Sequence, residues 1–101
     1  MYRIVWEFEV KADREAEFVD IYGPAGKWAN FFRLSPDYAG TQLFRSTTEP
    51  LHFVTLDEWR SRAAYEQFRK ANAVDFAALD DWCEQFIDRE RTLGVTDDGR
   101  D

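Results

Sequence analysis

Cysteine and histidine are nearly missing from this chain of 101 residues, which has one of each. Cys83 alone cannot form an internal disulfide, and one cysteine with one histidine does not make the usual zinc ligand set. The sequence also lacks a nucleophile elbow, a phosphate-cradling glycine loop and a two-histidine metal motif. These absences exclude a disulfide-stabilised scaffold and argue against zinc, flavin, nucleotide and serine-hydrolase chemistry.

Positive charge is scarce too, because 13 basic residues stand against 20 acidic ones and the formal net charge is −7. An acidic domain with no basic stripe repels phosphate backbones and anionic lipid surfaces, so we expect no nucleic acid and no membrane as partners. The chain has no apolar run of membrane-spanning length, and it starts in a strand-like pattern rather than a targeting segment. We expect a soluble, cytoplasmic protein whose cysteine stays reduced.

Aromatic residues, in contrast, are abundant: they make up 17% of the chain, with four tryptophans and nine phenylalanines. A chain of this length has room for one domain with one core, and it buries only about two thirds of its unfolded surface. Large rings in such a domain need partners, which its own core, a second subunit or a ligand can supply.

The hydrophobic pattern predicts four strands. A period of two over Tyr2–Val10 puts alternate residues on opposite faces, Ile4, Trp6, Phe8 and Val10 on one and Arg3, Val5, Glu7 and Glu9 on the other. Tyr38–Thr47 and His52–Asp57 flank the turn Thr48-Glu49-Pro50 and predict an antiparallel hairpin. A last strand is expected over Ile87–Val95.

Helical spacing predicts two helical segments between these strands. Asp13 is expected to cap the first, which breaks at Gly23-Pro24-Ala25-Gly26 because proline cannot donate a backbone hydrogen bond, and resumes over Lys27–Arg33. Ser61 is expected to cap the second, which loosens at Asn72. Its apolar stripe then continues through Phe76, Leu79, Cys83 and Phe86.

This order of elements predicts an α+β fold, a ferredoxin-like β-α-β-β-α-β domain with an antiparallel sheet over residues 1–95, followed by a flexible tail over residues 96–101. Its helices cover one face of the sheet. The other face carries Val5, Val54 and Leu56 and needs a second layer. We therefore expect a homodimer of C2 symmetry in which two sheets face each other and form a dimeric α/β barrel.

Three stretches resemble the antibiotic biosynthesis monooxygenase family of dimeric α/β barrels. The first is Ile4-Val5-Trp6-Glu7-Phe8-Glu9-Val10-Lys11 with Arg14-Glu15-Ala16-Glu17-Phe18, and the second is Pro36-Asp37-Tyr38-Ala39-Gly40. The third matches the family's Trp-x-Ser-x-x-Ala-aromatic block and reads Asp57-Glu58-Trp59-Arg60-Ser61-Arg62-Ala63-Ala64-Tyr65. The chain departs from the family at Ala12-Asp13, where Pro-Gly is usual.

The resemblance implies a cofactor-independent monooxygenase that acts with dioxygen on a small aromatic, phenolic or quinol-like substrate. Trp59 matches the junction tryptophan of the family, and Tyr65 matches an aromatic residue of its polyketide oxygenases, so both become candidate catalytic residues. Thr55 stands where those oxygenases carry asparagine. A second branch of the family degrades haem. This chain has Arg69 in place of its iron-ligating histidine and Trp6 in place of its asparagine. We expect no cofactor and no metal.

Each candidate also has a purely structural explanation. Trp59 either plugs the space between sheet and helices or forms a pocket wall, and the Tyr65 hydroxyl either donates to a substrate oxygen or reaches water. The candidate substrate-binding residues pack in the core or line a cleft, and they are Trp6, Thr55, Trp28 and Phe32. The alternative function is a non-catalytic dimer that binds a small aromatic molecule in the same cleft.

Two further residues carry chemistry but fit a site less well. His52 has no identifiable neighbour in the sequence that would orient its ring as a base. Cys83 is flanked by acidic residues, which do not favour a reactive thiolate, so we expect it to be a small buried hydrophobic residue.

Overall fold

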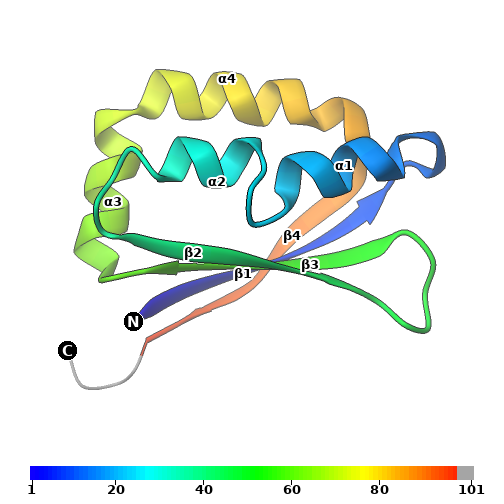
Figure 1. The fold of residues 1–101 in the computed structure, drawn as a ribbon, viewed down its shortest axis with the longest axis horizontal. Coiled ribbons are helices and arrows are strands. Elements are labelled where there is room, and N and C mark those ends of the chain that lie inside the picture. The colour runs from blue at the N-terminus through cyan, green and yellow to red at the C-terminus, as the bar shows by residue number, and fades with distance from the viewer. Residues whose placement is uncertain (98–101) are drawn as a thin grey trace.

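The computed structural model describes residues 1–97 as one antiparallel sheet of four strands, covered on one face by helices (Figure 1). Along the chain the elements are β1 (Tyr2–Val10), the short 3-10 helix η1 (Ala12–Arg14), α1 (Glu15–Tyr22), α2 (Lys27–Phe32), β2 (Tyr38–Arg45), β3 (His52–Trp59), α3 (Arg62–Ala71), α4 (Ala73–Cys83), the 3-10 helix η2 (Glu84–Phe86) and β4 (Ile87–Thr96). The strand order is β2-β3-β1-β4. The predicted α+β, ferredoxin-like fold is confirmed.

The sheet extends differently from the prediction at three strand ends. Trp59 belongs to β3, where it pairs with Tyr2 of β1 and Tyr38 of β2, so β3 runs past Asp57. β2 stops at Arg45 because the Ser46 hydroxyl accepts hydrogen bonds from two backbone amides of the following turn, at 3.2 and 3.0 Å. β4 includes position 96, which was expected in the tail; positions 98–101 of that tail lie outside the described residues.

The prediction that Asp13 caps the first helix is wrong. Positions 12–14 form η1, and α1 begins at Glu15 without a side-chain cap. Arg14 sits just before this helix because its guanidinium is held from two sides: Nε donates to Glu17 at 2.6 Å and Nη2 donates to Gln85 at 3.0 Å. These contacts outweigh the local preference of aspartate for the cap position.

The other helix boundaries follow the prediction. α1 and α2 are separate helices, and a Cβ atom at Gly26 would lie 2.3 Å from the Ile21 carbonyl oxygen, so only glycine fits this break. The Ser61 hydroxyl accepts a 3.1 Å hydrogen bond from the Ala64 amide and caps α3. At Asn72 the second helical segment divides into α3 and α4. α3 stands at the end of the sheet where β3 ends and β2 begins (Figure 1).

Aromatic rings fill most of the space between the sheet and the helices. Phe18 of α1 stacks on Tyr22 with ring centroids 4.3 Å apart and meets Phe8 of β1 edge-on at 5.2 Å. Phe32 of α2 packs edge-to-face on Trp59 at 5.4 Å. Such pairs contribute about 0.5–1.5 kcal/mol each beyond the area they bury. The abundance of rings in the sequence is therefore explained largely by the core.

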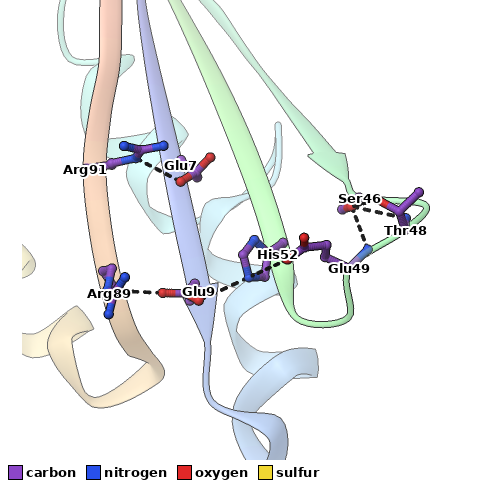
Figure 2. A network of polar contacts seen from close by, with 8 residues as sticks. All are labelled: Glu7, Glu9, Ser46, Thr48, Glu49, His52, Arg89 and Arg91. Atoms are coloured by element: carbon purple, nitrogen blue, oxygen red, sulfur yellow. Dashed lines mark hydrogen bonds and ion pairs between the residues drawn. The ribbon is translucent and has the colours of Figure 1, made fainter.

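The face of the sheet turned away from the helices carries ion pairs around a small apolar centre. Figure 2 shows a row of contacts in which Arg91 pairs with Glu7 at 2.9 Å, Arg89 pairs with Glu9 at 3.2 Å, and His52 lies 3.1 Å from Glu9. The half-buried apolar residues of this face are Val5, Val54 and Leu56, as predicted from the alternation. None of the helices within residues 1–97 is long and apolar enough to cross a membrane.

Candidate active site

A cavity of about 150 Å³ lies between the sheet and the helices. Its walls combine aromatic rings with polar side chains: Trp6, Phe8, Tyr22, Trp28, Phe32, Tyr65 and Phe76 supply rings, and Thr41, Thr55, Asp57, Arg69, Asp80 and Glu90 supply polar groups. All four strands and all four α-helices contribute to this wall. The structure thus brings five of the six predicted site residues together, namely Trp6, Trp28, Phe32, Thr55 and Tyr65.

Trp59, the sixth, lies behind this wall. Its side chain has no exposed area, and its ring packs edge-to-face on Tyr65 at 5.3 Å and on Phe32 at 5.4 Å. Among the described residues its indole N–H has no hydrogen-bond partner. Trp59 therefore holds two wall residues in place from outside the cavity and does not itself present a surface to it.

Asp57 is the cavity residue that the sequence prediction missed as a functional group. It is 9% exposed and lies on the inner face of β3, between Ile4 of β1 and Thr41 of β2. The period of two in β3 contains the signal, because Asp57 follows Phe53 and Thr55 on the buried face. A carboxyl group on a buried strand face is costly unless it is paired or functional.

A short chain of hydrogen bonds supports this carboxyl group. Thr41 Oγ1 donates to Asp57 Oδ1 at 2.6 Å, and the Tyr38 hydroxyl lies 2.5 Å from Thr41 Oγ1. The second carboxyl oxygen, Oδ2, has no hydrogen-bond partner within residues 1–97. Burial raises the pKa of Asp57 to about 6, although the bond from Thr41 works in the opposite direction.

A protonated phenol stands near the same cavity wall. The Tyr65 hydroxyl accepts a 3.1 Å hydrogen bond from Arg69 Nη1. Burial raises the pKa of Tyr65, so its hydroxyl keeps its proton at neutral pH and can donate it in a hydrogen bond. The guanidinium carbon of Arg69 lies 3.8 Å from the centre of the Phe76 ring, which places the one cationic side chain among the described wall residues over an aromatic face.

Two more carboxyl groups line the cavity, Asp80 from α4 and Glu90 from β4. Partial burial raises the pKa of Asp80, and the charge of Asp81 adds to the effect. Partial burial also raises the pKa of Glu90, with further contributions from Asp80 and Glu84. Neither Asp80 nor Glu90 forms a hydrogen bond or ion pair with another described residue.

Comparison with known proteins identifies the family to which this fold belongs. The sequence matches the model of the antibiotic biosynthesis monooxygenase family over residues 1–79. The chain belongs to this family. No curated protein is significantly similar to it in sequence.

Solved structures share the fold at low sequence identity. An antibiotic biosynthesis monooxygenase family protein from Deinococcus radiodurans superposes with a TM-score of 0.74 at 14% identity, covering 100% of this chain and 95% of its own. SnoaB, a cofactor-independent oxygenase from Streptomyces nogalater, gives 0.71 at 16% identity over 99% and 94%. A NIPSNAP domain protein from Burkholderia xenovorans gives 0.70 at 13% over 99% and 96%. At these identities the likeness shows the fold.

The remaining candidates lie away from the cavity of this family member. His52 is on the opposite face of the sheet, between Glu9 at 3.1 Å and Glu49 at 3.5 Å (Figure 2). Cys83 is buried, as predicted, and burial raises the pKa of its thiol. In the part of the chain that the structure describes, no three His, Cys, Asp or Glu residues are grouped so that they could hold a metal ion.

Proposed function

We propose that this chain is a cofactor-independent monooxygenase of a small phenolic or quinol-like substrate, which binds in the aromatic cavity. The observation that supports this most directly is the Asp57 carboxyl group, 9% exposed and facing an aromatic cavity with one oxygen unpartnered among residues 1–97. Oxygenation without a cofactor needs a substrate anion that can give an electron to dioxygen. A buried base with a pKa of about 6 is ionised at neutral pH and is suited to form that anion.

The proposed reaction converts a phenol and dioxygen into a para-quinone and water. Asp57 takes the phenolic proton, and the phenolate gives one electron to dioxygen. The superoxide and the phenoxyl radical then combine at the para carbon to form a peroxide, which takes the proton back from Asp57. Loss of the para C–H proton breaks the O–O bond, releases water and leaves the quinone. The protein binds, desolvates and orients the substrate for these steps.

The wall residues have matching proposed roles. Trp6, Trp28 and Phe32 stack against the substrate ring. The hydroxyl groups of Tyr65 and Thr55 hydrogen-bond to substrate oxygens; that of Tyr65 is the stronger candidate donor because a phenol is more acidic than an aliphatic alcohol. Trp59 acts as a positioning residue through its edge-to-face contact with Tyr65 at 5.3 Å.

The size of the cavity supports a small substrate. A dry cavity of about 150 Å³ is known to accommodate a benzene molecule, and the cavity here has about the same volume. A single ring therefore fits without rearrangement, whereas three fused rings would need the helices to move. We expect one-ring phenols and hydroquinones to be better substrates than anthrones.

Oxygen consumption tests this proposal. The purified protein is mixed with a panel of one-ring phenols, hydroquinones and anthrones, and oxygen uptake is recorded with an electrode against a protein-free control. Protein-dependent uptake on a one-ring phenol with a hydrogen at its para carbon, with para-quinone formed in equal amount and no hydrogen peroxide, supports the proposal. No uptake above the control on any compound contradicts it.

The alternative is a non-catalytic protein that binds an aromatic metabolite in the same cavity. Thr55 favours it, because the family's polyketide oxygenases carry asparagine at this position, and because Thr55 is a weak proton acceptor. Trp6 and Trp28 line the cavity and report its occupancy by fluorescence. Binding that saturates with no product and no oxygen uptake favours this alternative over the monooxygenase.

We also propose that two copies of the chain pair through the uncovered face of the sheet as a dimeric α/β barrel. On that face Val5 pairs with Leu56, and Val54 pairs with Phe44, which is 49% exposed. Burial of apolar area contributes about 25 cal/mol per Å² removed from water. Ion pairs surround this apolar centre, which is the usual arrangement of a protein–protein interface.

A further inference from the structure

Carboxyl groups on the two faces of the sheet differ in their partners. On the uncovered face, Glu7 pairs with Arg91 and Glu9 pairs with Arg89 (Figure 2). In the cavity, Asp80 and Glu90 have no such partner among residues 1–97, although they stand near each other's charge. Arginine pairs directly with the acidic residues of the uncovered face, whereas in the cavity Arg69 acts on Asp80 only through its charge and forms no ion pair with it.

Among the described residues of the cavity wall, Arg69 is the one cationic side chain, and it already contacts two other wall residues. Arg69 donates to the Tyr65 hydroxyl at 3.1 Å, and its guanidinium carbon lies 3.8 Å from the centre of the Phe76 ring. With Asp57, Asp80 and Glu90 ionised, the wall carries three negative charges and one positive charge. A ligand that brings a positive charge would relieve this imbalance, whereas a carboxylate ligand would increase it.

The rest of the wall suits the same kind of ligand. Seven aromatic side chains line the cavity, and an ammonium group is attracted to the face of such rings. One oxygen of the wall is left for a ligand: Asp57 Oδ2 has no hydrogen-bond partner among the described residues, on a side chain that is 9% exposed.

We propose that the cavity binds a single-ring aromatic amine, with its ring among the aromatic side chains and its protonated amine between Asp80 and Glu90. This deepens the proposed function, because it concerns the substrate class of the same cavity. Asp57 pairs with Ile4 of β1 and Glu90 pairs with Phe8. Four residues of strand span about 13 Å, so the base and the amine site lie at different ends of the cavity, and the ligand carries its hydroxyl and its amine at opposite ends of the ring.

Three probes that share a phenol ring and differ in the charge of a short tail test this inference: tyramine, para-ethylphenol and para-hydroxyphenylpropanoate. Affinities are measured by tryptophan fluorescence and by calorimetry. We expect tyramine to bind about tenfold more tightly than para-ethylphenol, since an ammonium group over aromatic faces and between two carboxylates contributes on that order. The carboxylate probe should bind most weakly. Equal affinities for the three probes would overturn the inference.

Two matched double variants test whether the preference for tyramine depends on Asp80 and Glu90. Asp80→Asn with Glu90→Gln removes the two unpaired charges of the cavity and should abolish the preference for tyramine over para-ethylphenol. Asp75→Asn with Asp88→Asn removes two charges from α4 and β4 outside the cavity wall and should retain the preference. A preference that persists in the Asp80/Glu90 variant would show that the amine does not bind there.

These results are separable from those on catalysis. Oxygen uptake is measured on one-ring phenols that carry a hydrogen at the para carbon, because the binding probes are substituted there and cannot form a para-quinone. Tyramine preference without uptake on those phenols contradicts the proposed monooxygenase and supports the amine site. Uptake on those phenols with no preference for tyramine supports the monooxygenase and rejects the amine site.

Discussion

Thr41 donates its hydroxyl proton to Asp57 across the pairing of β2 and β3, over 2.6 Å between Oγ1 and Oδ1. A threonine hydroxyl has one proton, so the Tyr38 hydroxyl must be the donor in its 2.5 Å contact with Thr41. The direction of this chain of hydrogen bonds is thereby fixed toward the carboxylate. Asp57 keeps one oxygen held by the fold and one oxygen for a substrate proton.

Replacement of Asp57 by asparagine should remove the base while keeping the shape of the side chain. We expect Asp57→Asn to lower the rate of oxygen uptake by about 10²–10⁴-fold, the usual contribution of a general base. In the wild type the rate should rise with pH as the carboxyl group ionises, with an inflection near its pKa of about 6. A pH–rate profile between pH 4 and 8 checks both expectations. An unchanged rate in the variant would remove Asp57 from the mechanism.

The hydrogen bond from Thr41 to Asp57 should determine the pH at which the pH–rate profile has its inflection. It stabilises the ionised carboxyl group and lowers the pKa of Asp57 against the effect of burial. Thr41→Val should therefore move the inflection of the pH–rate profile to higher pH, whereas Thr41→Ser, which keeps the hydroxyl group, should leave it in place. The same profile in both variants would mean that Thr41 has only a structural role.

Asp57 should also make the fold less stable at neutral pH. Its pKa is raised from 3.8 to about 6, so between these values the folded state binds more protons than the unfolded state, and stability falls as pH rises. Each unit of pKa shift corresponds to about 1.4 kcal/mol, so Asp57→Asn should raise the free energy of unfolding at pH 7 by up to about 3 kcal/mol. Urea denaturation at pH 4 and pH 7 measures the difference, which should shrink at the lower pH. Asp75→Asn, at an exposed position of α4, serves as the control and should show little change at either pH.

The contrast between Asp57 and Trp59 shows which features of the site the sequence predicts and which it does not. Both belong to the block that resembles the family, and the alternation of β3 puts both on the inner face. The sequence predicts that face correctly, but it does not tell which inner residues border empty space. That depends on how α2 and α3 pack, and these helices enclose Trp59 completely while leaving Asp57 at the cavity wall.

Of the two predicted helix starts, the sequence predicts that of α3 correctly and that of α1 wrongly. Ser61 caps α3 as predicted because its hydroxyl group acts within one turn of its own chain. The start of α1 could not be predicted in this way, since Arg14 is held partly by Gln85, 71 positions further along the chain. Local preference decides a boundary where no distant residue competes for it.

A charge on the uncovered face of the sheet should separate the proposed dimer. Light scattering at micromolar concentration should give about twice the chain mass of 11.9 kDa for the wild type. Val54→Asp should give a monomer of lower stability, because it places an unpaired charge between two apolar faces. Val74→Asp adds the same charge to α4, where the side chain is 82% exposed, and should remain dimeric. A monomeric wild type would reject the pairing.

The wall of the cavity is the hydrophobic core itself, since every strand and every α-helix supplies part of it. A molecule in this space is thus a component of the packing, and its departure loosens the whole domain. A ligand that binds only the folded state at 100 times its Kd adds about 2.7 kcal/mol to the free energy of unfolding, which in a domain of this size raises Tm by about 10 °C or more. The melting temperature of the chain can therefore rank unknown metabolites by affinity before any reaction has been observed.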